Sequence, residues 1–229
     1  MIADLHIHSK FSYDSLLSPE KILKVSKKRG LDVIAITDHE TIRGGLEVQK
    51  MNSDEDFFVI VGCEINTEIG DIIGLFVNEE INSKIFIEVV EEIKIQGGLV
   101  ILPHPFRGHR LENSVIQYID AVEIFNSRST IEQNAKALLL AKEWKKPITA
   151  GSDAHFASEI GLGSVNIVNF SNDNDLISEF DEKSVIGSLN PWYLTYLSQM
   201  IKSGKSKNFS LFARQFINLV GQVPRFIKK

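Results

Sequence analysis

The stretch Asp4-Leu5-His6-Ile7-His8-Ser9 stands directly after a short apolar run at the start of the chain. Two histidines at positions i and i+2 of an extended segment project from the same side, so their imidazoles can bind one metal ion together. In β/α barrels the chemistry lies where strands end, and the histidine pair has that position. A His-x-His pair alone also fits two surface or half-buried histidines, so the downstream sequence decides between the two interpretations.

Apolar runs alternate with helical stretches along the first 168 residues. Continuous short apolar runs are typical of buried parallel strands. Their alternation with helical patterns predicts a parallel sheet covered by helices, and about seven strand candidates favour closure into a β/α barrel. Helix starts are indicated by Ser18-Pro19 and by the capping box that begins at Thr130. We expect strands at residues 1–5, 33–36, 57–61, 71–77, 99–102, 121–125, 147–150 and 165–168, and helices at 19–29, 83–96 and 131–144.

Residues of metal-binding type recur in one position relative to the expected strands. Five of the six histidines, with Glu64 and Asp153, lie within a few residues after an apolar run. In a barrel these positions converge on one rim, whereas scattered histidines have no reason to share them. Imidazoles and carboxylates without a thiolate cluster suit zinc, manganese or iron. Because Asp14 adds a further ligand, several ions sharing a bridging carboxylate are expected. The candidates are His6, His8, Asp14, His39, Glu64, His104, Asp153 and His155.

Composition bounds the kind of protein. With 229 residues, of which 43% are hydrophobic, the chain can bury the core of one large α/β domain or one and a half domains. Cys63 is the single cysteine, which excludes an intramolecular disulfide and fits a reducing compartment. Since the sequence contains no signal-like segment and no apolar run of about 18 residues, we expect a cytoplasmic protein that does not enter a membrane.

Charge separates the two ends of the chain. Eight of the 25 basic residues and none of the 30 acidic residues lie after Glu182. Aromatic and aliphatic side chains recur there near helical spacing, which predicts helices packed on the barrel or on a second subunit in a homo-oligomer. The basic charges leave nucleic-acid binding through the tail as an alternative. We therefore divide the chain into a barrel, residues 1–185, and a basic helical C-terminal extension, residues 186–229.

Four ordered segments carry a family resemblance. Asp4 to Ser9, Thr37-Asp38-His39, Pro103-His104-Pro105 and Gly151-Ser152-Asp153-Ala154-His155 resemble the motifs of the PHP (polymerase and histidinol phosphatase) family, with Glu64 between the second and the third. The resemblance spans about residues 1–168. It implies a distorted seven-stranded (β/α)7 barrel with two or three divalent metal ions, acting on phosphate esters.

The same resemblance implies a division of the ligands among three ions. One ion would be bound by His6, His8, Glu64 and Asp153, and Glu64 would bridge to a second ion that His104 also binds. A third ion would be bound by Asp14, His39 and His155. Where some relatives have another histidine at the second ion, this chain has Asn126, which leaves the number of ligands to that ion open.

The ligand types indicate how a phosphate ester would be hydrolysed. A phosphate monoester resists attack because its negative charge repels a nucleophile, and bound cations remove that repulsion. Two ions about 3.5–4 Å apart can bind the phosphoryl oxygens, generate hydroxide from a shared water and stabilise the leaving oxygen. We therefore expect a metal-bound hydroxide as nucleophile at a di- or trinuclear site, with Glu64 and Asp153 as its central carboxylates.

Other polar residues stand beside the expected ligands. Arg107 and Arg128 are expected to bind a phosphate through paired hydrogen bonds, although arginines at a rim are equally often solvated. Asp4 and Asp38 are expected either to orient imidazoles or to be ordinary strand-end and turn aspartates. Cys63 is expected to be a buried thiol more often than a ligand.

Several functions fit this ligand set. A metal-dependent phosphatase acting on a small phosphomonoester or nucleotide needs every ligand, and the chain has them. An exonuclease acting on nucleic-acid ends would use the same ions and a positively charged groove, which only the tail offers. Histidinol-phosphate phosphatase activity is a further alternative. A non-catalytic binding module would be expected to have lost ligands. The expected partner is therefore a small phosphorylated substrate.

Overall fold

The computed structural model describes residues 1–167 and 184–227, with side chains to residue 221. Its centre is a nine-stranded sheet in the order β7-β6-β5-β4-β3-β2-β1-β8-β9. Val168, Lys183, Lys228 and Lys229, on which part of the expected last strand and of the basic tail falls, lie outside the described residues. The strands are β1 (Ile2–Ile7), β2 (Val33–Ile36), β3 (Phe58–Thr67), β4 (Gly70–Leu75), β5 (Leu99–Leu102), β6 (Ala121–Asn126), β7 (Ile148–Gly151), β8 (Gly163–Asn166) and β9 (Val185–Gly187).

The sheet curls until its two halves nearly close into a barrel. Ile7 at the end of β1 forms a parallel bridge with Ala154, and the His8 amide donates to the Ala154 carbonyl at 2.9 Å. Strand β7 passes directly against β1, since a Cβ added at Gly151 would lie 2.3 Å from the Cβ of His6. The predicted barrel is confirmed as a mixed α/β fold, and its closure brings the ends of β1 and β7 together.

The sheet is mixed, whereas the alternation of strands and helices predicted a parallel sheet. Strand β4 runs antiparallel to both β3 and β5, and β8 runs antiparallel to β1 and β9. Strands β3 and β4 form a tight hairpin in which Thr67 pairs with Gly70, and Gly70 has the positive φ of +125° that such a turn requires. Because β4 supplies partners to residues 62–67, β3 continues past its expected end and Glu64 lies within the strand.

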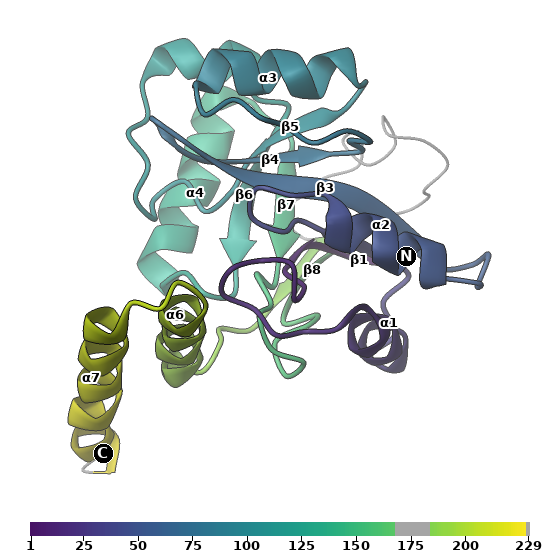
Figure 1. Cartoon of the computed structure of the whole chain (residues 1–229). Coiled ribbons are helices and arrows are strands. Elements are labelled where there is room, and N and C mark those ends of the chain that lie inside the picture. The colour runs from purple at the N-terminus through teal and green to yellow at the C-terminus, as the bar shows by residue number, and fades with distance from the viewer. Residues whose placement is uncertain (168–183, 228–229) are drawn as a thin grey trace.

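Helices cover the outer face of the sheet (Figure 1). Helix α1 begins as predicted, with Pro19 in its first turn and the Ser18 hydroxyl accepting the Lys21 amide. The capping box of α4, between Thr130 and Gln133, is also present. Helix α2 was not predicted; it has no side-chain cap, and glycines occupy its second and third positions. The helices of the barrel are α1 (Pro19–Lys28), α2 (Arg43–Met51), α3 (Phe86–Ile95), the short 3-10 helix η1 (Asn113–Tyr118) and α4 (Ile131–Trp144).

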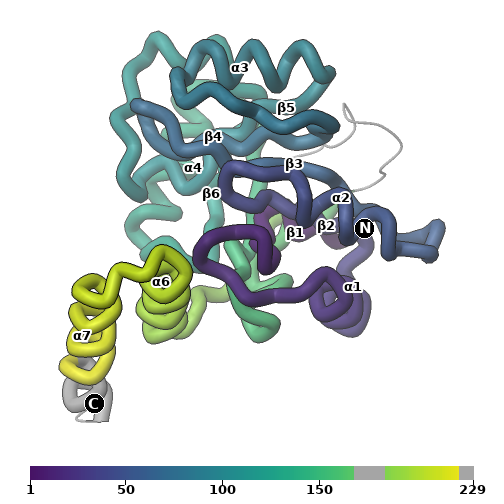
Figure 2. Tube along the Cα trace, in the orientation of Figure 1, coloured from purple at the N-terminus to yellow at the C-terminus, as the bar shows by residue number. Residues whose placement is uncertain are grey.

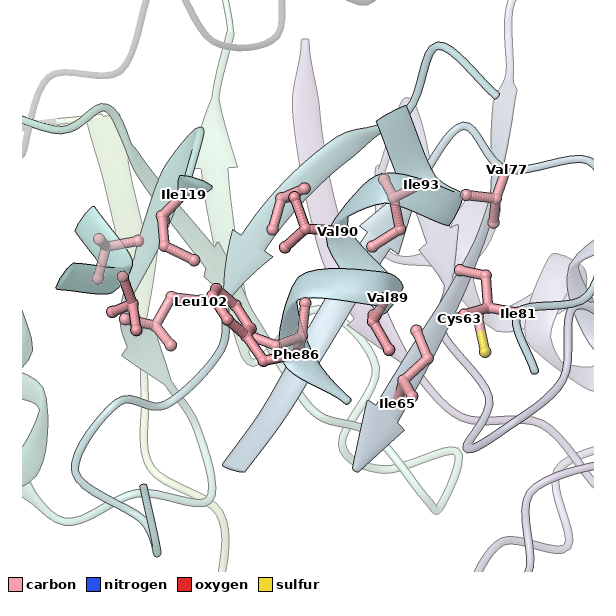
Figure 3. Close-up of a cluster of buried hydrophobic side chains, with 14 of the residues drawn as sticks. Cys63, Ile65, Val77, Ile81, Phe86, Val89, Val90, Ile93, Leu102 and Ile119 are labelled. Carbon is pink, nitrogen blue, oxygen red and sulfur yellow. The ribbon is translucent and has the colours of Figure 1, made fainter. Parts of the chain in front are cut away.

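The largest apolar cluster fills the space between the sheet and helix α3 (Figure 3). Cys63 lies in this cluster, fully buried beside Ile65 and Ile81, and burial raises the pKa of its thiol well above the ordinary value. Neighbouring residues of a strand point to opposite faces, so Glu64 faces the other way. The expectation that Cys63 is a buried thiol fits this position.

Two helices form the C-terminal extension, as predicted: α6 (Trp192–Lys205) and α7 (Phe209–Ile227). Figures 1 and 2 show α6 beside the loop that follows β1, while α7 points away from the barrel. Leu194 of α6 is buried, whereas Phe209 of α7 is 81% exposed. Within the described residues, no helix is long and apolar enough to cross a membrane.

Candidate metal centre

Glu64 lies at the middle of a cluster of four imidazoles. Its Oε1 is 2.9 Å from His104 Nε2. Its Oε2 is 3.4 Å from His6 Nε2, 3.3 Å from His8 Nε2 and 3.2 Å from His39 Nδ1. The nitrogens of His6 and His8 lie 3.1 Å apart, so the pair projects from one side of β1 as its spacing predicts. A carboxylate with each oxygen beside a different imidazole set has the arrangement of a bridging ligand.

A second group of ligand atoms lies around Asp14. Asp14 Oδ2 is 3.0 Å from His155 Nε2 and 3.4 Å from His39 Nε2. Together with His8, these side chains place one ligand atom each within 4.8 Å of the others. The loop after β1 and the segment after β7 thus meet at this group, although they are far apart in sequence.

Asp153 completes the centre from the segment after β7. Its Oδ1 lies 3.3 Å from His8 Nε2 and 3.7 Å from His6 Nε2, and its Oδ2 accepts a hydrogen bond of 2.6 Å from Arg107. Asp153 and His104 have φ values of +52° and +28°, a backbone region that residues other than glycine seldom adopt. Strained backbone of this kind often occurs at functional sites, and here it directs both side chains into the cluster.

Three imidazoles are oriented by hydrogen bonds at Nδ1. His6 Nδ1 donates to Glu123 Oε1 at 3.0 Å, and His155 Nδ1 donates to the carbonyl of Asp153 at 2.8 Å. His8 Nδ1 forms a 3.0 Å hydrogen bond with the Ser12 hydroxyl. In a neutral imidazole, a hydrogen bond from Nδ1 to a carboxylate or carbonyl oxygen, as at His6 and His155, leaves Nε2 free as a metal ligand. In each case Nε2 points into the cluster.

Sequence reasoning missed Glu123 and Asp71. Glu123 is buried in β6, where it also accepts the His104 amide, and a lone carboxylate inside an apolar strand was the available signal. Asp71 stands at the start of β4, paired with Asn66, and it groups with Glu64 and His104. It was missed because a parallel β4 would have placed its start at the opposite rim.

The aspartates beside the ligands do not contact imidazoles. Asp4 accepts the backbone amides of Ser152 and Gly161 at 2.9 and 2.7 Å, and Asp38 accepts the amide and hydroxyl of Ser9. Both aspartates join strand ends to neighbouring segments by hydrogen bonds, which is the role of ordinary strand-end and turn aspartates. Burial raises the pKa of Asp4 to about 6, against the hydrogen bonds from Ser152 that lower it.

Asn126 lies at the rim, and both the nitrogen and the oxygen of its side-chain amide form hydrogen bonds within the protein. Its amide nitrogen donates to Glu123 at 3.0 Å and to Asp153 at 3.3 Å. Its oxygen accepts from the backbone amide of Arg128 and from the Arg107 guanidinium. In this arrangement Asn126 positions Asp153, and its oxygen is already engaged.

The two arginines have different surroundings. Arg107 pairs with Asp153, and its side chain remains 36% exposed. Arg128 is nearly buried: it pairs with Glu159 at 3.1 Å and donates to the Ser198 hydroxyl of α6. Arg107 is therefore free on one side to meet a ligand, whereas Arg128 chiefly connects the rim to α6.

The pKa values of His155 and Glu64 favour the deprotonated forms that bind metal ions. Burial and the nearby Arg128 charge lower the pKa of His155 to about 4, so this imidazole is neutral at pH 7. Burial opposes ionisation of Glu64, but His39 and His6 lower its pKa well below the ordinary value. For His8, burial is outweighed by hydrogen bonds to Asp153 and Glu64, which raise the pKa to about 9. A cation must therefore displace a proton from His8.

The donor set fits divalent metal ions. Asp14 Oδ1 is buried and has no hydrogen-bond partner among the described residues. Buried carboxylate oxygens without a partner are costly, and a cation beside the imidazoles of His39 and His155 would satisfy this one. The nitrogen and oxygen ligands, without a thiolate, match zinc, manganese or iron.

A pocket of about 380 Å³ lies against the cluster. Most of its wall comes from the loops at the strand ends, but helix α6 contributes one side. The lining residues are Tyr13, Asp14, His39, Asn66, Asp71, Arg107, Arg128, Asp153 and His155 from the barrel, with Thr195, Gln199 and Lys202 from α6.

Family models match most of the chain. The model of the PHP domain matches residues 4–146, and the model of the PHP-associated family matches residues 132–185. A protein from Methanocaldococcus jannaschii, described as uncharacterized, is 45% identical over 141 residues, which are 56% of this chain and 82% of that protein. A 5′-3′ exoribonuclease from Haemophilus influenzae is 38% identical over 64 residues, which are 28% of this chain and 23% of the exoribonuclease.

Solved structures share the fold. A two-domain protein from Bacteroides vulgatus, described as containing a predicted PHP-like metal-dependent phosphoesterase, superposes with a TM-score of 0.66 at 17% identity. The match covers 81% of this chain and 63% of that protein, so the chain spans less than two thirds of its length. At this identity the likeness concerns the fold alone.

Proposed function

The chain belongs to the PHP domain family, and we propose that it is a metal-dependent phosphoesterase that hydrolyses a small phosphomonoester or a nucleotide. The observation that carries this proposal is the position of Glu64, whose two oxygens lie between the imidazoles of four histidines. One bridging carboxylate in such a cluster suits two or three divalent ions, zinc, manganese or iron. When bound, these ions would neutralise the phosphate charge and activate water.

The side chains around the ions would bind and orient the substrate. His6, His8 and Asp153 would serve one ion with Glu64, His104 would serve a second, and Asp14, His39 and His155 a third. Arg107 reaches the cluster through Asp153 and is partly exposed, so its guanidinium is placed to donate paired hydrogen bonds to phosphoryl oxygens. Arg128 would act mainly by positioning α6, because Glu159 and Ser198 occupy its guanidinium.

The size of the pocket favours a small substrate. Its volume of about 380 Å³ lies at the lower end of the range for small-molecule sites. A nucleic-acid strand would need a positively charged groove, whereas this pocket includes the carboxylates of Asp14, Asp71 and Asp153. The match to a short part of an exoribonuclease nevertheless keeps cleavage at nucleic-acid ends as the second candidate.

A substrate panel tests the proposal. Purified protein would be supplied with manganese, zinc or iron and assayed against phosphomonoesters, including histidinol phosphate, and against nucleotides and short oligonucleotides. We expect metal-dependent release of inorganic phosphate from at least one small ester. Release of mononucleotides from oligonucleotides, with no turnover of small esters, would establish the nuclease instead. No hydrolysis of any phosphate ester with any of the three metals would contradict both.

A further inference from the structure

Helix α6 lies beyond both matched family models, yet it forms one wall of the pocket. Thr195, Gln199 and Lys202 are spaced by four and three residues, so they share one face of the helix. That face is fixed to the barrel, because Arg128 donates to the Ser198 hydroxyl and to the Leu194 carbonyl. The pocket wall therefore includes side chains that the metal cluster does not require.

Lys202 brings a positive charge close to the cluster. Its ammonium lies 4.3 Å from the ring centroid of Tyr13, and the Tyr13 ring stacks on His39 with centroids 4.4 Å apart and planes 1° apart. His39 in turn contacts Asp14 and Glu64. A single aromatic ring thus connects the lysine to an imidazole of the centre.

Within the described part of the chain, no ion pair neutralises the charge of Lys202. Its ammonium instead lies over the Tyr13 ring. Arg107 on the barrel side already pairs with Asp153, and Lys205 donates to backbone carbonyls. An ammonium at a pocket wall that lacks a carboxylate partner is suited to an anionic ligand. Because Tyr13 separates it from the cluster, that anion would not be the phosphoryl group bound at the ions.

We propose that Lys202 of α6, with Gln199 and Thr195 beside it, forms a subsite for a second anionic group of the substrate. The inference rests on the proposed phosphoesterase function and narrows it. Favoured substrates carry a carboxylate or a second phosphate several bonds away from the phosphate that is hydrolysed. Gln199 and Thr195 would donate hydrogen bonds to the same group or to neighbouring hydroxyls.

Non-hydrolysable ligands test the subsite by binding alone. Butylphosphonate carries one anionic group, while 4-phosphonobutyrate and butane-1,4-bisphosphonate add a carboxylate or a second phosphonate at the far end. Calorimetric titration of the metal-loaded protein should show that at least one of the two ligands with a second anionic group binds about tenfold more tightly than butylphosphonate, as one hydrogen bond to a charged group would give. Which of the two gains more identifies the anion.

Variants assign the preference to Lys202. Lys202→Met should remove the preference, so that all three ligands bind this variant with similar affinities, and Lys202→Arg should keep the preference. Lys207→Met, at an exposed lysine beyond the end of α6, is the matched control and should bind like the wild type. Thermal unfolding would confirm that each variant is folded.

The outcomes separate the two proposals. If all three ligands bind the wild type equally, or if Lys202→Met keeps the preference, the subsite is overturned while the metal centre stands. If none of the phosphonates binds the metal-loaded wild type, the subsite is also overturned, while the substrate panel decides the phosphoesterase proposal separately.

Discussion

The strand ends and helix α6 meet at the same pocket but contribute different kinds of side chain. His6, His8 and Glu64 are almost completely buried and contact one another. Gln199 and Lys202 of α6 are half-buried and contribute only to the wall. The barrel thus supplies the candidate ligands, and α6 supplies side chains of the pocket wall that those ligands do not contact.

Helix α7 extends the contrast. Helix α6 is attached to the barrel through Leu194, Arg128 and the three hydrogen bonds of Lys205. Apolar residues of α7 remain exposed instead, with Phe216 at 52% and Ile217 at 67%. The two consecutive helices therefore differ in placement: α6 lines a pocket, and α7 presents exposed apolar side chains.

The largest effect is expected from Glu64→Gln, which removes the charge shared by the ions but keeps the shape of the side chain. Residues that merely support metal ligands change metal affinity or activity about 10- to 100-fold when replaced. Because Glu64 itself would bind the ions, turnover should fall about 100-fold or more. Circular dichroism should show an unchanged fold, because Glu64 faces the site and not the apolar cluster. Glu55→Gln, at an exposed position, is the matched control. Near-normal turnover of the Glu64 variant at saturating metal would refute the bridging role.

A pH dependence of opposite sign is expected with and without metal. In metal-free protein, hydrogen bonds to Asp153 and Glu64 raise the pKa of His8 from 6.5 to about 9 despite burial. A raised pKa in the folded state stabilises the protein fully below the unfolded value, and this stabilisation disappears as the pH rises through 9. A pKa increase of this size corresponds to roughly 3 kcal/mol of folding stability.

Thermal unfolding between pH 6 and 9.5 measures this difference. In the presence of a chelator the midpoint should fall as the pH rises. Metal-loaded protein should gain metal affinity over the same range, because the ions compete with protons for His8. A chelated protein whose midpoint rises steadily to pH 9.5 would show that His8 is neutral without metal.

A smaller effect is expected at Lys205, which connects α6 to the ligand-bearing loop. Its ammonium donates to the carbonyls of Lys10, Ser12 and Ser15, which flank Asp14. Lys205→Met should release the loop and weaken the ion bound by Asp14 about tenfold or more, as for other residues that support ligands. Metal titration followed by calorimetry should show one weakened ion and the others unchanged. Equal affinities in Lys205→Met and wild type would show that α6 does not position the loop.

The smallest effect on activity is expected from removing α7. Deleting residues 207–229 takes away exposed apolar side chains and leaves the pocket wall intact, so kcat should stay within twofold of wild type. Light scattering should reveal a lower oligomeric state if the apolar face pairs with a second copy of the chain. Oligonucleotide binding at low and high salt gives the other comparison, since backbone binding weakens steeply with salt. Oligonucleotide binding that the full chain shows and the shortened chain lacks would favour the nuclease candidate.

Much of the candidate site could be predicted from sequence, because ligands that follow apolar runs must converge when the strands form one barrel. The direction of β4 could not be predicted, because the sequence of a short apolar strand does not indicate whether it runs parallel or antiparallel to its neighbours. Asp71 was missed for that reason. Glu123 lay inside an expected strand and was taken as part of it. The contacts of Arg128 with α6 depend on tertiary packing that periodicity does not encode.

The tail shows the same limit. Aromatic and aliphatic residues at helical spacing, among them Tyr193, predicted packing. In α6 the buried apolar residue is Leu194, while Tyr193 is 43% exposed. The same pattern in α7 leaves Phe209 and Phe216 exposed within the described chain. Helical spacing identifies an apolar face but does not identify its partner, so the pocket-lining role of α6 became visible only in three dimensions.

Metal content tests the central claim most directly. Elemental analysis of protein purified without chelators should find more than one ion of zinc, manganese or iron per chain in the wild type, and fewer in Glu64→Gln. Protein that contains no metal after mild purification, and that gains neither bound ions nor phosphoesterase activity when all three metals are supplied, would contradict the assignment of a multinuclear centre.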